Sequence, residues 1–402
     1  MDKYIGVLGI VTIFGVAYLM SDDRKSISWR AVISGTLLTF VIALAVRLPW
    51  FTQAFETMGW GIDKILESSK KGAEAVLGND LVYGKWIFAV QVYFAIVFVN
   101  ILTTIGFHLK LIQPVVKAFA WCMQRTMGIS GAEAFSSSAS VFLGQVESQL
   151  VVRPYLSRLT NSELFAMMTT NMSTIAGTVL VVYVSMGMNA ALLIAASIMT
   201  APAGLTLAKI ICPEKDKEAI NRQVKMEVED PYLSVFDAFL QGATEGAKLG
   251  GVVIIMVFGA VAMVAFLNTI FGGITGMLGY NLQLQDVLAY PFAPAMWLIG
   301  VPWVDCLEVG REMATRILVN EFVAYIDLAK QISAGSLTPK GQMIATIALC
   351  GFCNFSSIAI NVGGLAMLIP ERRADLLKMG MRALIAANLA TWLGAALVGI
   401  LY

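Results

Sequence analysis

The sequence predicts an all-α polytopic membrane protein, with about eight membrane-spanning helices and two re-entrant helical hairpins. The 402-residue chain is 58% hydrophobic and only 14% charged, and its mean hydropathy is +0.75, all outside the usual range of soluble domains. Several apolar stretches reach the length of about 20 residues that a helix needs to cross the hydrocarbon core. Two further segments are too polar for ordinary spans and too apolar for surface loops.

The apolar stretches give the predicted spans in chain order. They cover residues 4–21, 31–46, 86–107, 164–208 (two crossings), 249–285, 341–370 and 383–402. We interpret them as helices because a helix satisfies its own backbone hydrogen bonds inside the bilayer. The first stretch does not resemble a cleaved signal peptide, since no small-residue cleavage site follows it and a second apolar stretch comes at once.

The distribution of basic residues predicts how the chain is oriented. Short cytoplasmic loops carry an excess of Lys and Arg. Basic clusters follow the first span (Arg24, Lys25, Arg30), the third span (Lys110, Lys117, Arg125) and the fifth span (Lys215, Lys217, Arg222, Lys225). Two more precede the fourth span (Arg153, Arg158) and the last span (Arg372, Arg373, Lys378). An outside N-terminus follows, and we expect a multi-pass protein of the cell (inner) membrane. Residues 51–85, with four lysines and mixed charges, are predicted to form an amphipathic helix in the interface.

The two polar-tipped segments are predicted to be hairpins that enter the membrane and return. One runs roughly from Gly131 to Leu156 and contains GQVES, and the other runs from about Val287 to Leu328 and contains LVNEFVAY. Non-helical backbone at membrane depth is tolerated only where protein buries it or a wet cavity faces it. Because Gln145 and Glu147 point to one side only if the backbone there is extended, we place both at a hairpin tip.

The sequence after each hairpin indicates an internal repeat. NMSTIAG, residues 171–177, follows the first hairpin, and NFSSIAI, residues 354–360, follows the second. Each motif lies inside an apolar span, and each unit closes with one more span. Repeats with helices interrupted near the midplane are the usual construction of secondary transporters, whose binding site lies where the repeats meet.

The remaining charged and sulfur-containing residues are interpreted structurally. Glu308 with Arg311, or Glu312 with Arg316, has the spacing of an ion pair along one helix face, and with Asp305 these residues are predicted to form a salt-bridge lattice. His108, the single histidine, is interpreted as a boundary residue at a span end, with a proton relay as the alternative. Cys350 and Cys353 are interpreted as small core residues, because no second Cys or His pair with zinc spacing accompanies them.

Five motifs carry a family resemblance. GQVESQLVVRPYLSRLTNSELFAMMT, STIAG, GVPW, NEFVAY and CGFCNFSSIAI, in this order and at these separations, resemble the concentrative nucleoside transporter family, in particular its bacterial-type members. The resemblance covers nearly the whole chain. It implies a homotrimer in which a scaffold supports a moving transport part. The implied scaffold is residues 1–110 with its interfacial helix and residues 213–286, a cytoplasmic loop and the sixth span; the implied transport part is residues 111–212 and 287–402.

The resemblance also implies a nucleoside site. Glu321, Asn354 and Ser357 would contact the ribose, Gln145 and Glu147 would reach the base directly or through water, and Phe352 and Val179 would pack around it. Carboxylates and amides match the hydroxyls of ribose and the edges of a base, and a carboxylate makes charge-assisted hydrogen bonds. Asn354 and Ser357 also share a helix face by their spacing alone. Val146 departs from the family, where a hydroxyl residue is usual, and Gln149 replaces a common proline.

The coupling ion stays open between Na⁺ and H⁺, and no other cofactor is expected. Aligned on GQVES and STIAG, the sodium ligands of relatives correspond to Ser140, Leu143, Thr174 and Ile175. Many sodium-coupled relatives have an asparagine where this chain has Ser140, and some proton-coupled bacterial members resemble it at Ser140 and Thr174. Glu147 is the acid best suited to bind a proton.

The expected function is therefore a cation-coupled secondary active importer of nucleosides that works by an elevator movement. The alternatives are a carrier of another polar metabolite, such as a nucleobase or a dicarboxylate, and a passive channel. Two acidic tips disfavour an anionic substrate, because like charges repel in a low-dielectric site. A net charge of +1 does not suggest nucleic acid as a partner. Without a second histidine, a metal cluster or a nucleophile elbow, no enzyme chemistry is expected.

Overall fold

The predicted fold class is confirmed by a computed structural model that describes residues 2–46, 48–84, 87–216, 230–277 and 283–402. These residues form helices and connecting loops and contain no strand. Within them, five helical segments are long and apolar enough to cross a membrane: Phe88–His108, Asn161–Ser185, Ala190–Ile211, Val235–Gly276 and Pro370–Leu401. Three shorter apolar helices are Ile5–Leu19, Trp29–Ala45 and Phe355–Leu368. Together the eight correspond one to one with the predicted spans.

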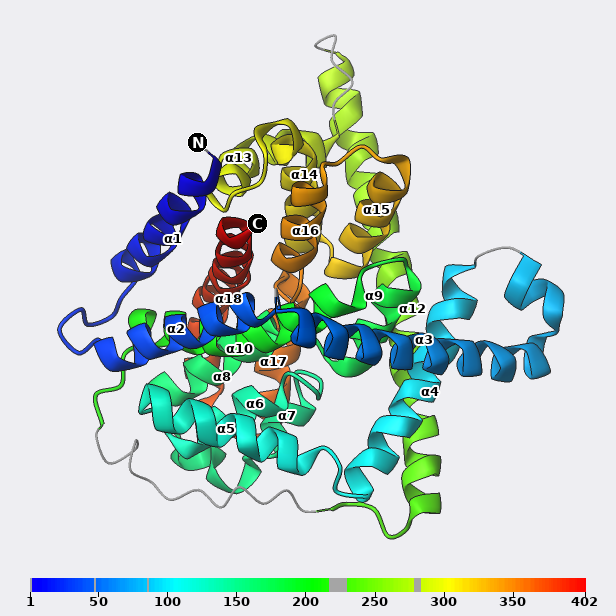
Figure 1. Cartoon of the computed structure of the whole chain (residues 1–402), viewed down its shortest axis with the longest axis horizontal. Helices are drawn as coiled ribbons and strands as arrows, with labels where there is room; N and C mark the ends of the chain where they lie inside the picture. The colour runs from blue at the N-terminus through cyan, green and yellow to red at the C-terminus, as the bar shows by residue number, and fades with distance from the viewer. Residues whose placement is uncertain (1, 47, 85–86, 217–229, 278–282) are drawn as a thin grey trace.

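The N-terminal region contains α1 (Asp2–Leu19), α2 (Trp29–Ala45) and the 29-residue α3 (Pro49–Leu77). Proline suits the first turn of α3, because the N–H that it lacks would have no partner there. Figure 1 shows α3 running across the molecule rather than along α18 (Arg373–Leu401). The predicted amphipathic helix therefore exists, although it ends at Leu77 and a short π-helix, Asp80–Gly84, follows it. Its place in the membrane interface stays a prediction.

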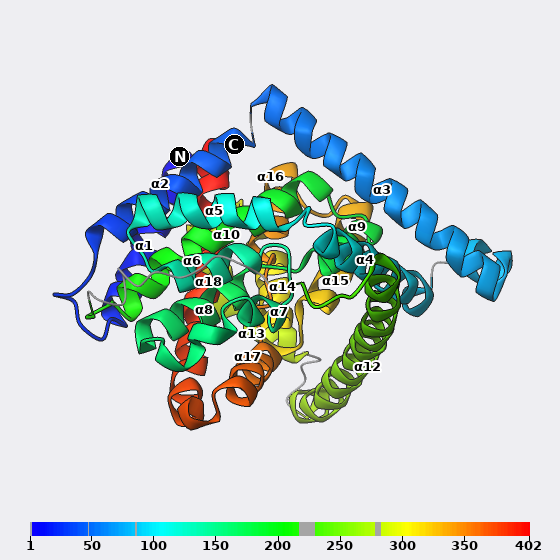
Figure 2. The ribbon, with the colours of Figure 1, turned by 90° about the horizontal axis from the view of Figure 1, so that it is seen from below.

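The helices α4 (Phe88–His108) and α12 (Val235–Gly276) pack tightly along a stripe of glycines. A Cβ added to Gly242, Gly246 or Gly250 would lie within 3 Å of α4 atoms. Small residues at this four-residue spacing let two membrane helices approach closely and bring polar groups together. Accordingly, Thr104 donates a hydrogen bond to the Ala238 carbonyl at 2.9 Å. Figure 2 shows this pair standing at one side of the remaining helices.

The first repeat unit contains the predicted hairpin and a broken span. Its helices are α5 (Gln113–Met127), α6 (Gly131–Ala139), α7 (Glu147–Leu150), the 3₁₀ turn η2 (Arg153–Arg158), α8 (Asn161–Ser173), α9 (Gly177–Ser185) and α10 (Ala190–Ile211). Residues 140–146 between α6 and α7 form the non-helical tip, which holds the first three residues of GQVES; its last two residues begin α7. The span that contains STIAG is broken at residues 174–176, as the repeat interpretation requires.

The second repeat unit has its hairpin, broken span and final span in the same order as the first unit, but its hairpin starts later than predicted. It comprises α13 (Leu284–Leu298), the 3₁₀ turn η3 (Trp303–Asp305), α14 (Cys306–Leu318), α15 (Glu321–Ala334), α16 (Pro339–Ala348), α17 (Phe355–Leu368), the 3₁₀ turn η4 (Pro370–Arg372) and α18. The polar tip lies between α14 and α15. A start of the hairpin at Val287 is therefore wrong, because Gly300 (φ +98°) turns the chain and makes α13 a separate helix packed on α14.

The two broken spans touch each other at their breaks. Gly351 lies in the α16–α17 break at φ +129°, and a Cβ there would be 2.6 Å from the Ser173 carbonyl oxygen at the end of α8. The Cys353 thiol donates to the neighbouring Met172 carbonyl at 3.1 Å. Only glycine combines this backbone angle with so close an approach. The two repeats thus meet where helical hydrogen bonding is interrupted.

Replacement of Gly351 by alanine is expected to destabilise the protein by more than about 3 kcal/mol, because strain at a positive φ and overlap with the α8 backbone add together. Gly187→Ala is the matched control. Gly187 also has a positive φ (+96°) but open space around it, so it should cost only about 1–2 kcal/mol. The measurement is the temperature at which each detergent-purified variant loses its monodisperse peak. Equal behaviour of the two variants would contradict the close crossing.

Candidate functional site

The tip of the second hairpin and the start of α17 form one hydrogen-bonded unit. Asn354 caps α17: its side-chain oxygen accepts the Ser357 N–H at 2.9 Å, while its amide nitrogen donates to Glu321 Oε2 at 2.5 Å. All three residues are at least 98% buried. Because both ends of the amide are engaged, Asn354 fixes the Glu321 carboxylate relative to α17.

Glu321 lies at a helix N-terminus and next to a group of aromatic rings. It is the first residue of α15, and Asn320 caps that helix by accepting the Val323 N–H at 3.0 Å. A helix N-terminus carries partial positive charge and stabilises a carboxylate in its first turn. On α9, Tyr183 packs its ring against Phe322 and Tyr325, the centroids 5.3 and 4.3 Å apart. Aromatic rings therefore wall one side of the acidic tip.

The tip of the first hairpin joins this unit through an amide. Gln145 Nε2 donates to the Ser357 hydroxyl at 3.1 Å, and its side-chain oxygen accepts from Asn361 Nδ2. Asn361 in turn accepts from Gln149 Nε2 at 3.0 Å. Every one of these bonds crosses from the first repeat to the second. The predicted meeting of the two repeats is thus made by the side chains of Gln145, Gln149, Ser357 and Asn361.

Behind the first tip, a second set of bonds holds it against α8. The Ser148 hydroxyl donates to Asn171 Oδ1 at 3.0 Å, and Asn171 Nδ2 donates to the Gln145 carbonyl at 3.3 Å. The backbone of the tip also contacts the broken span, since the Phe142 carbonyl accepts the Gly177 N–H at 3.2 Å. The tip is therefore held to α8 and α9 as well as to α17.

The two predicted acids have different surroundings. Glu147 is exposed at the start of α7, and its carboxylate makes no hydrogen bond or ion pair with the described residues, whereas Glu321 is 2% exposed. The two predicted acids therefore differ in burial. Each acid lies beside a polar hairpin tip, as the sequence pattern predicted, but the difference in their burial was not predicted.

The predicted apolar residues lie around these groups. Val179 is buried in the first turn of α9, and Phe352 is half-buried in the α16–α17 break. Val146 packs toward α17, where its Cγ2 would lie 3.2 Å from a Cβ on Gly364. A hydroxyl residue at position 146 would therefore face the helix that carries Asn354 and Ser357.

The predicted ion ligands lie on two segments that the tip contact brings together. Ser140 donates to the Ser137 carbonyl at 2.9 Å and Thr174 to the Thr170 carbonyl at 2.9 Å, and both hydroxyls are buried. Each hydroxyl proton is thereby used, so the oxygen lone pairs remain available as acceptors. Leu143 is half-buried in the tip, and the buried Ile175 in the break has a carbonyl that accepts the Ser197 hydroxyl at 3.3 Å.

Family profiles and related proteins match this chain along nearly its whole length. Residues 192–399 match the profile of the Na⁺ dependent nucleoside transporter C-terminus, residues 8–80 that of its N-terminus, and residues 89–190 a nucleoside recognition (Gate) domain. The chain is 34% identical over 419 residues to sodium/nucleoside cotransporter 1 of Homo sapiens, covering 100% of this chain and 64% of that one. The chain belongs to the sodium-dependent nucleoside transporter family. The resemblance found in the five motifs is confirmed.

Other relatives of the family match at full length. An uncharacterized transporter of Bacillus subtilis, YutK, is 36% identical over 404 residues, which are 99% of each chain. The solved structure of CNTnw in an inward-facing substrate-bound state has a TM-score of 0.93 and 34% identity, covering 100% of this chain and 98% of that one. A variant of CNTnw in an outward-facing state has a TM-score of 0.95 and 34% identity, with 100% and 97% covered. The protein is accordingly a multi-pass membrane transporter and not an enzyme.

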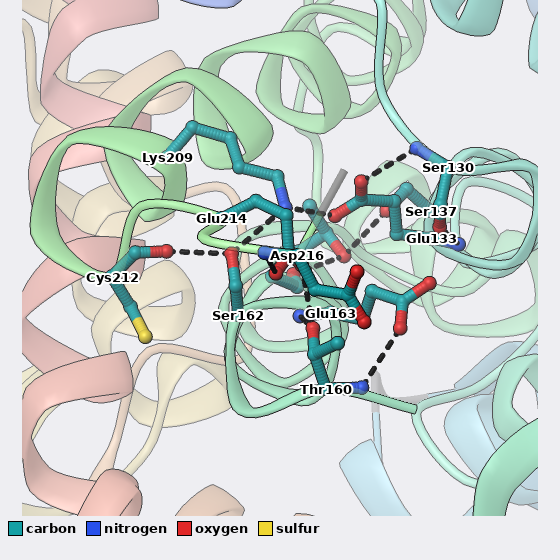
Figure 3. Close-up of polar contacts among 12 residues, drawn as sticks. Ser130, Glu133, Ser137, Thr160, Ser162, Glu163, Lys209, Cys212, Glu214 and Asp216 are labelled. Atoms are coloured by element: carbon teal, nitrogen blue, oxygen red, sulfur yellow. Dashed lines mark hydrogen bonds and ion pairs between the residues drawn. The ribbon is translucent and has the colours of Figure 1, made fainter. Parts of the chain in front are cut away.

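A buried charge cluster lies where three helix ends meet (Figure 3). Lys209, in the last turn of α10, forms an ion pair with Glu133 at 2.7 Å and donates to the Ser162 hydroxyl at 2.9 Å. Glu133 closes a capping box with Ser130 at the start of α6, and Glu163 does the same with Thr160 at the start of α8. Each charge thus complements its helix dipole. The cluster ties the first hairpin arm to the first half of the broken span and to α10.

The lattice predicted for α14 is only partly present. Arg311 pairs with Glu308 at 3.3 Å as predicted and also with Asp286 of α13 at 2.7 Å. Glu312 and Arg316 are both described by the structure, and they do not form the predicted ion pair. Arg316 is fully buried and donates instead to the Ala348 carbonyl and to the Asn388 side chain. Ala348 is the last residue of α16, and the partial negative charge at that helix C-terminus favours the arginine.

The other residues interpreted structurally lie at a helix end and in the core. His108 is the last residue of α4, and its Nδ1 lies 2.7 Å from an Asp230 carboxylate oxygen. Cys350 and Cys353 are buried free cysteines. Within the part of the chain that the structure describes, no group of three or more His, Cys, Asp and Glu residues has the arrangement of a metal site.

Proposed function

We propose that the protein imports nucleosides by coupling their uptake to a cation gradient, through an elevator-type movement between outward- and inward-facing states. The observation that supports this best is the continuous network Gln145–Ser357–Asn354–Glu321, which contains groups of both repeats and a carboxylate 98% buried. Buried ionisable groups inside membrane proteins usually mark a transport pathway. A neutral solute with several hydroxyls fits this network better than an anion does.

In the proposed complex the ribose lies against Glu321, Asn354 and Ser357. The Glu321 carboxylate is a pure acceptor that Asn354 holds in place, and its remaining lone pairs suit sugar hydroxyls. The Gln145 amide, which bonds Ser357 here, can exchange that bond for one to the base. Glu147 lies in reach of water and completes the base side, with Val146, Val179 and Phe352 as apolar walls.

We propose Na⁺ as the coupling ion, in line with the family, with Ser140 and Thr174 hydroxyls and the Leu143 and Ile175 carbonyls as ligands. Oxygen ligands of this kind are what a hard cation prefers. The second candidate is H⁺, with Glu147 as the acid that would bind it. A serine at position 140 offers a weaker ligand than the amide of many sodium-coupled relatives.

The scaffold is proposed to comprise residues 1–110 and 213–286, and the transport part residues 111–212 and 287–402. The close packing of α4 on α12 supports a scaffold that is separate from the transport part. Residues 217–229 of the predicted cytoplasmic loop lie outside the described residues. Large apolar side chains such as Ile255, Phe258 and Phe266 are more than 60% exposed on α12. This face suits the subunit contacts of the proposed homotrimer.

The test is uptake into proteoliposomes with a panel of nucleosides under imposed Na⁺ or H⁺ gradients. We expect saturable accumulation of uridine or adenosine driven by an inward Na⁺ gradient. The Ser140→Asn variant adds an amide oxygen to the site, so it should lower the Na⁺ concentration needed for half-maximal uptake. Accumulation driven by H⁺ alone would reject the sodium assignment, and equilibration without accumulation would indicate a channel.

A further inference from the structure

The outer face of α17 carries a groove of about 620 Å³ that the proposed transport mechanism does not use. Its wall follows α17 at helical spacing through Phe355, Ile358, Val362, Ala366 and Pro370. The volume lies within the range of about 300–1,000 Å³ that is typical of small-ligand sites. Apolar side chains at the groove are nevertheless exposed, Met367 by 79% and Leu377 by 58%.

The groove and the candidate nucleoside site lie on opposite faces of one helix. Asn354, Ser357 and Asn361 point to the repeat interface, where they bond Glu321 and Gln145. The groove side of α17 carries no polar side chain among its lining residues. A nucleoside would leave its polar groups unpaired there, at a cost of several kcal/mol for each group, so the groove is not a second substrate site.

One end of the groove is positively charged. Arg373, at the start of α18, lines the groove and makes no hydrogen bond or ion pair with the described residues. Its neighbour Arg372 is occupied: it pairs with Asp375 at 2.9 Å and donates to the Leu159 carbonyl. The guanidinium of Arg373 is therefore available to a ligand in the groove.

We propose that this groove binds an anionic phospholipid, with an acyl chain along α17 and the phosphate at Arg373. The helix α17, with 14 residues, is about 21 Å long at 1.5 Å per residue, which exceeds the half-thickness of the hydrocarbon core, about 15 Å. The basic end belongs to the segment that the excess of Lys and Arg predicts to be cytoplasmic, where anionic headgroups attract basic side chains. The bound lipid would contact the back of the helix that carries Asn354 and Ser357.

Native mass spectrometry of the full chain, with phosphatidylglycerol or phosphatidylcholine added in equal amounts, tests the proposal. Wild type should retain phosphatidylglycerol preferentially. Arg373→Gln should weaken its retention about fivefold, because one basic side chain at an anionic surface contributes about that factor. Gly363→Leu should abolish retention, since Gly363 lines the groove and a Cβ there meets open space that the larger side chain would fill.

Two matched controls separate the groove from general effects. Gly15→Leu places the same side chain on open space along α1, and Lys25→Gln removes an exposed charge from the α1–α2 loop. Both should retain phosphatidylglycerol like wild type. Equal retention in Gly363→Leu and Gly15→Leu, or no preference for the anionic lipid, would overturn the proposal. A change of oligomeric mass in Gly363→Leu would also overturn it, because a second copy of the chain would then cover the groove.

Discussion

Glu321→Gln is expected to abolish nucleoside uptake while leaving the protein folded. The glutamine side chain has the same shape, and its oxygen can still accept the Asn354 amide that the carboxylate accepts at 2.5 Å. What is lost is a charged acceptor for sugar hydroxyls, and hydrogen bonds to charged groups contribute about 1.5–3 kcal/mol each. Loss of two such bonds should reduce uptake at limiting substrate by 100-fold or more. The measurement is initial uptake of labelled uridine into proteoliposomes.

The control for this prediction is Glu308→Gln, which removes a carboxylate from the same hairpin at a partly exposed ion pair with Arg311. Exposed pairs contribute little, so this variant should retain uptake and thermal stability close to wild type. Glu321→Gln should share its thermal stability but not its uptake. Normal uptake by Glu321→Gln would remove the ribose assignment, and a large loss of stability would indicate that Glu321 is a structural group.

Sequence patterns predicted the parts of the fold that depend on composition and local chain breaks. Apolar length gave the eight spans, and the polar tips around Gln145 and Glu321 gave the two hairpins. The paired motifs gave the two breaks, because Asn354 caps α17 through a local side-chain hydrogen bond that its sequence position already suggests. These features arise from residues close together in the chain.

Features that depend on distant contacts were missed. Asn361 follows Ser357 by one helical turn, and this spacing was the available signal for its part in the site, but its bonds to Gln145 and Gln149 cross more than 200 residues. The partner of Arg316 was misassigned for the same reason, since a helix end and Asn388 compete with a neighbouring acid. The boundary of α13 depends on the backbone angle of Gly300, which composition does not specify.

Lys209→Met is expected to lower the stability of the protein by more than the removal of a surface charge does. Lys209 and Glu133 have side chains 4% and 1% exposed and are 2.7 Å apart. Removal of one partner of a buried pair leaves an uncompensated charge and typically costs about 3–5 kcal/mol. The substitution also removes the hydrogen bond that the Ser162 hydroxyl accepts from Lys209. That hydroxyl itself donates to the Cys212 carbonyl just after the end of α10. The midpoint of thermal inactivation in detergent should fall by about 5 °C or more.

A second substitution tests whether the unpaired charge is the cause. In Lys209→Met with Glu133→Gln, the glutamine oxygen can still accept the Ser130 N–H that completes the capping box, while no charge remains buried at this pair. The double variant should therefore regain part of the lost stability. Lys215→Met, which removes an exposed lysine paired with Asp23 at 3.3 Å, should leave the midpoint almost unchanged. If the double variant is as unstable as Lys209→Met alone, packing around the lysine stem stabilises this junction and the ion pair does not.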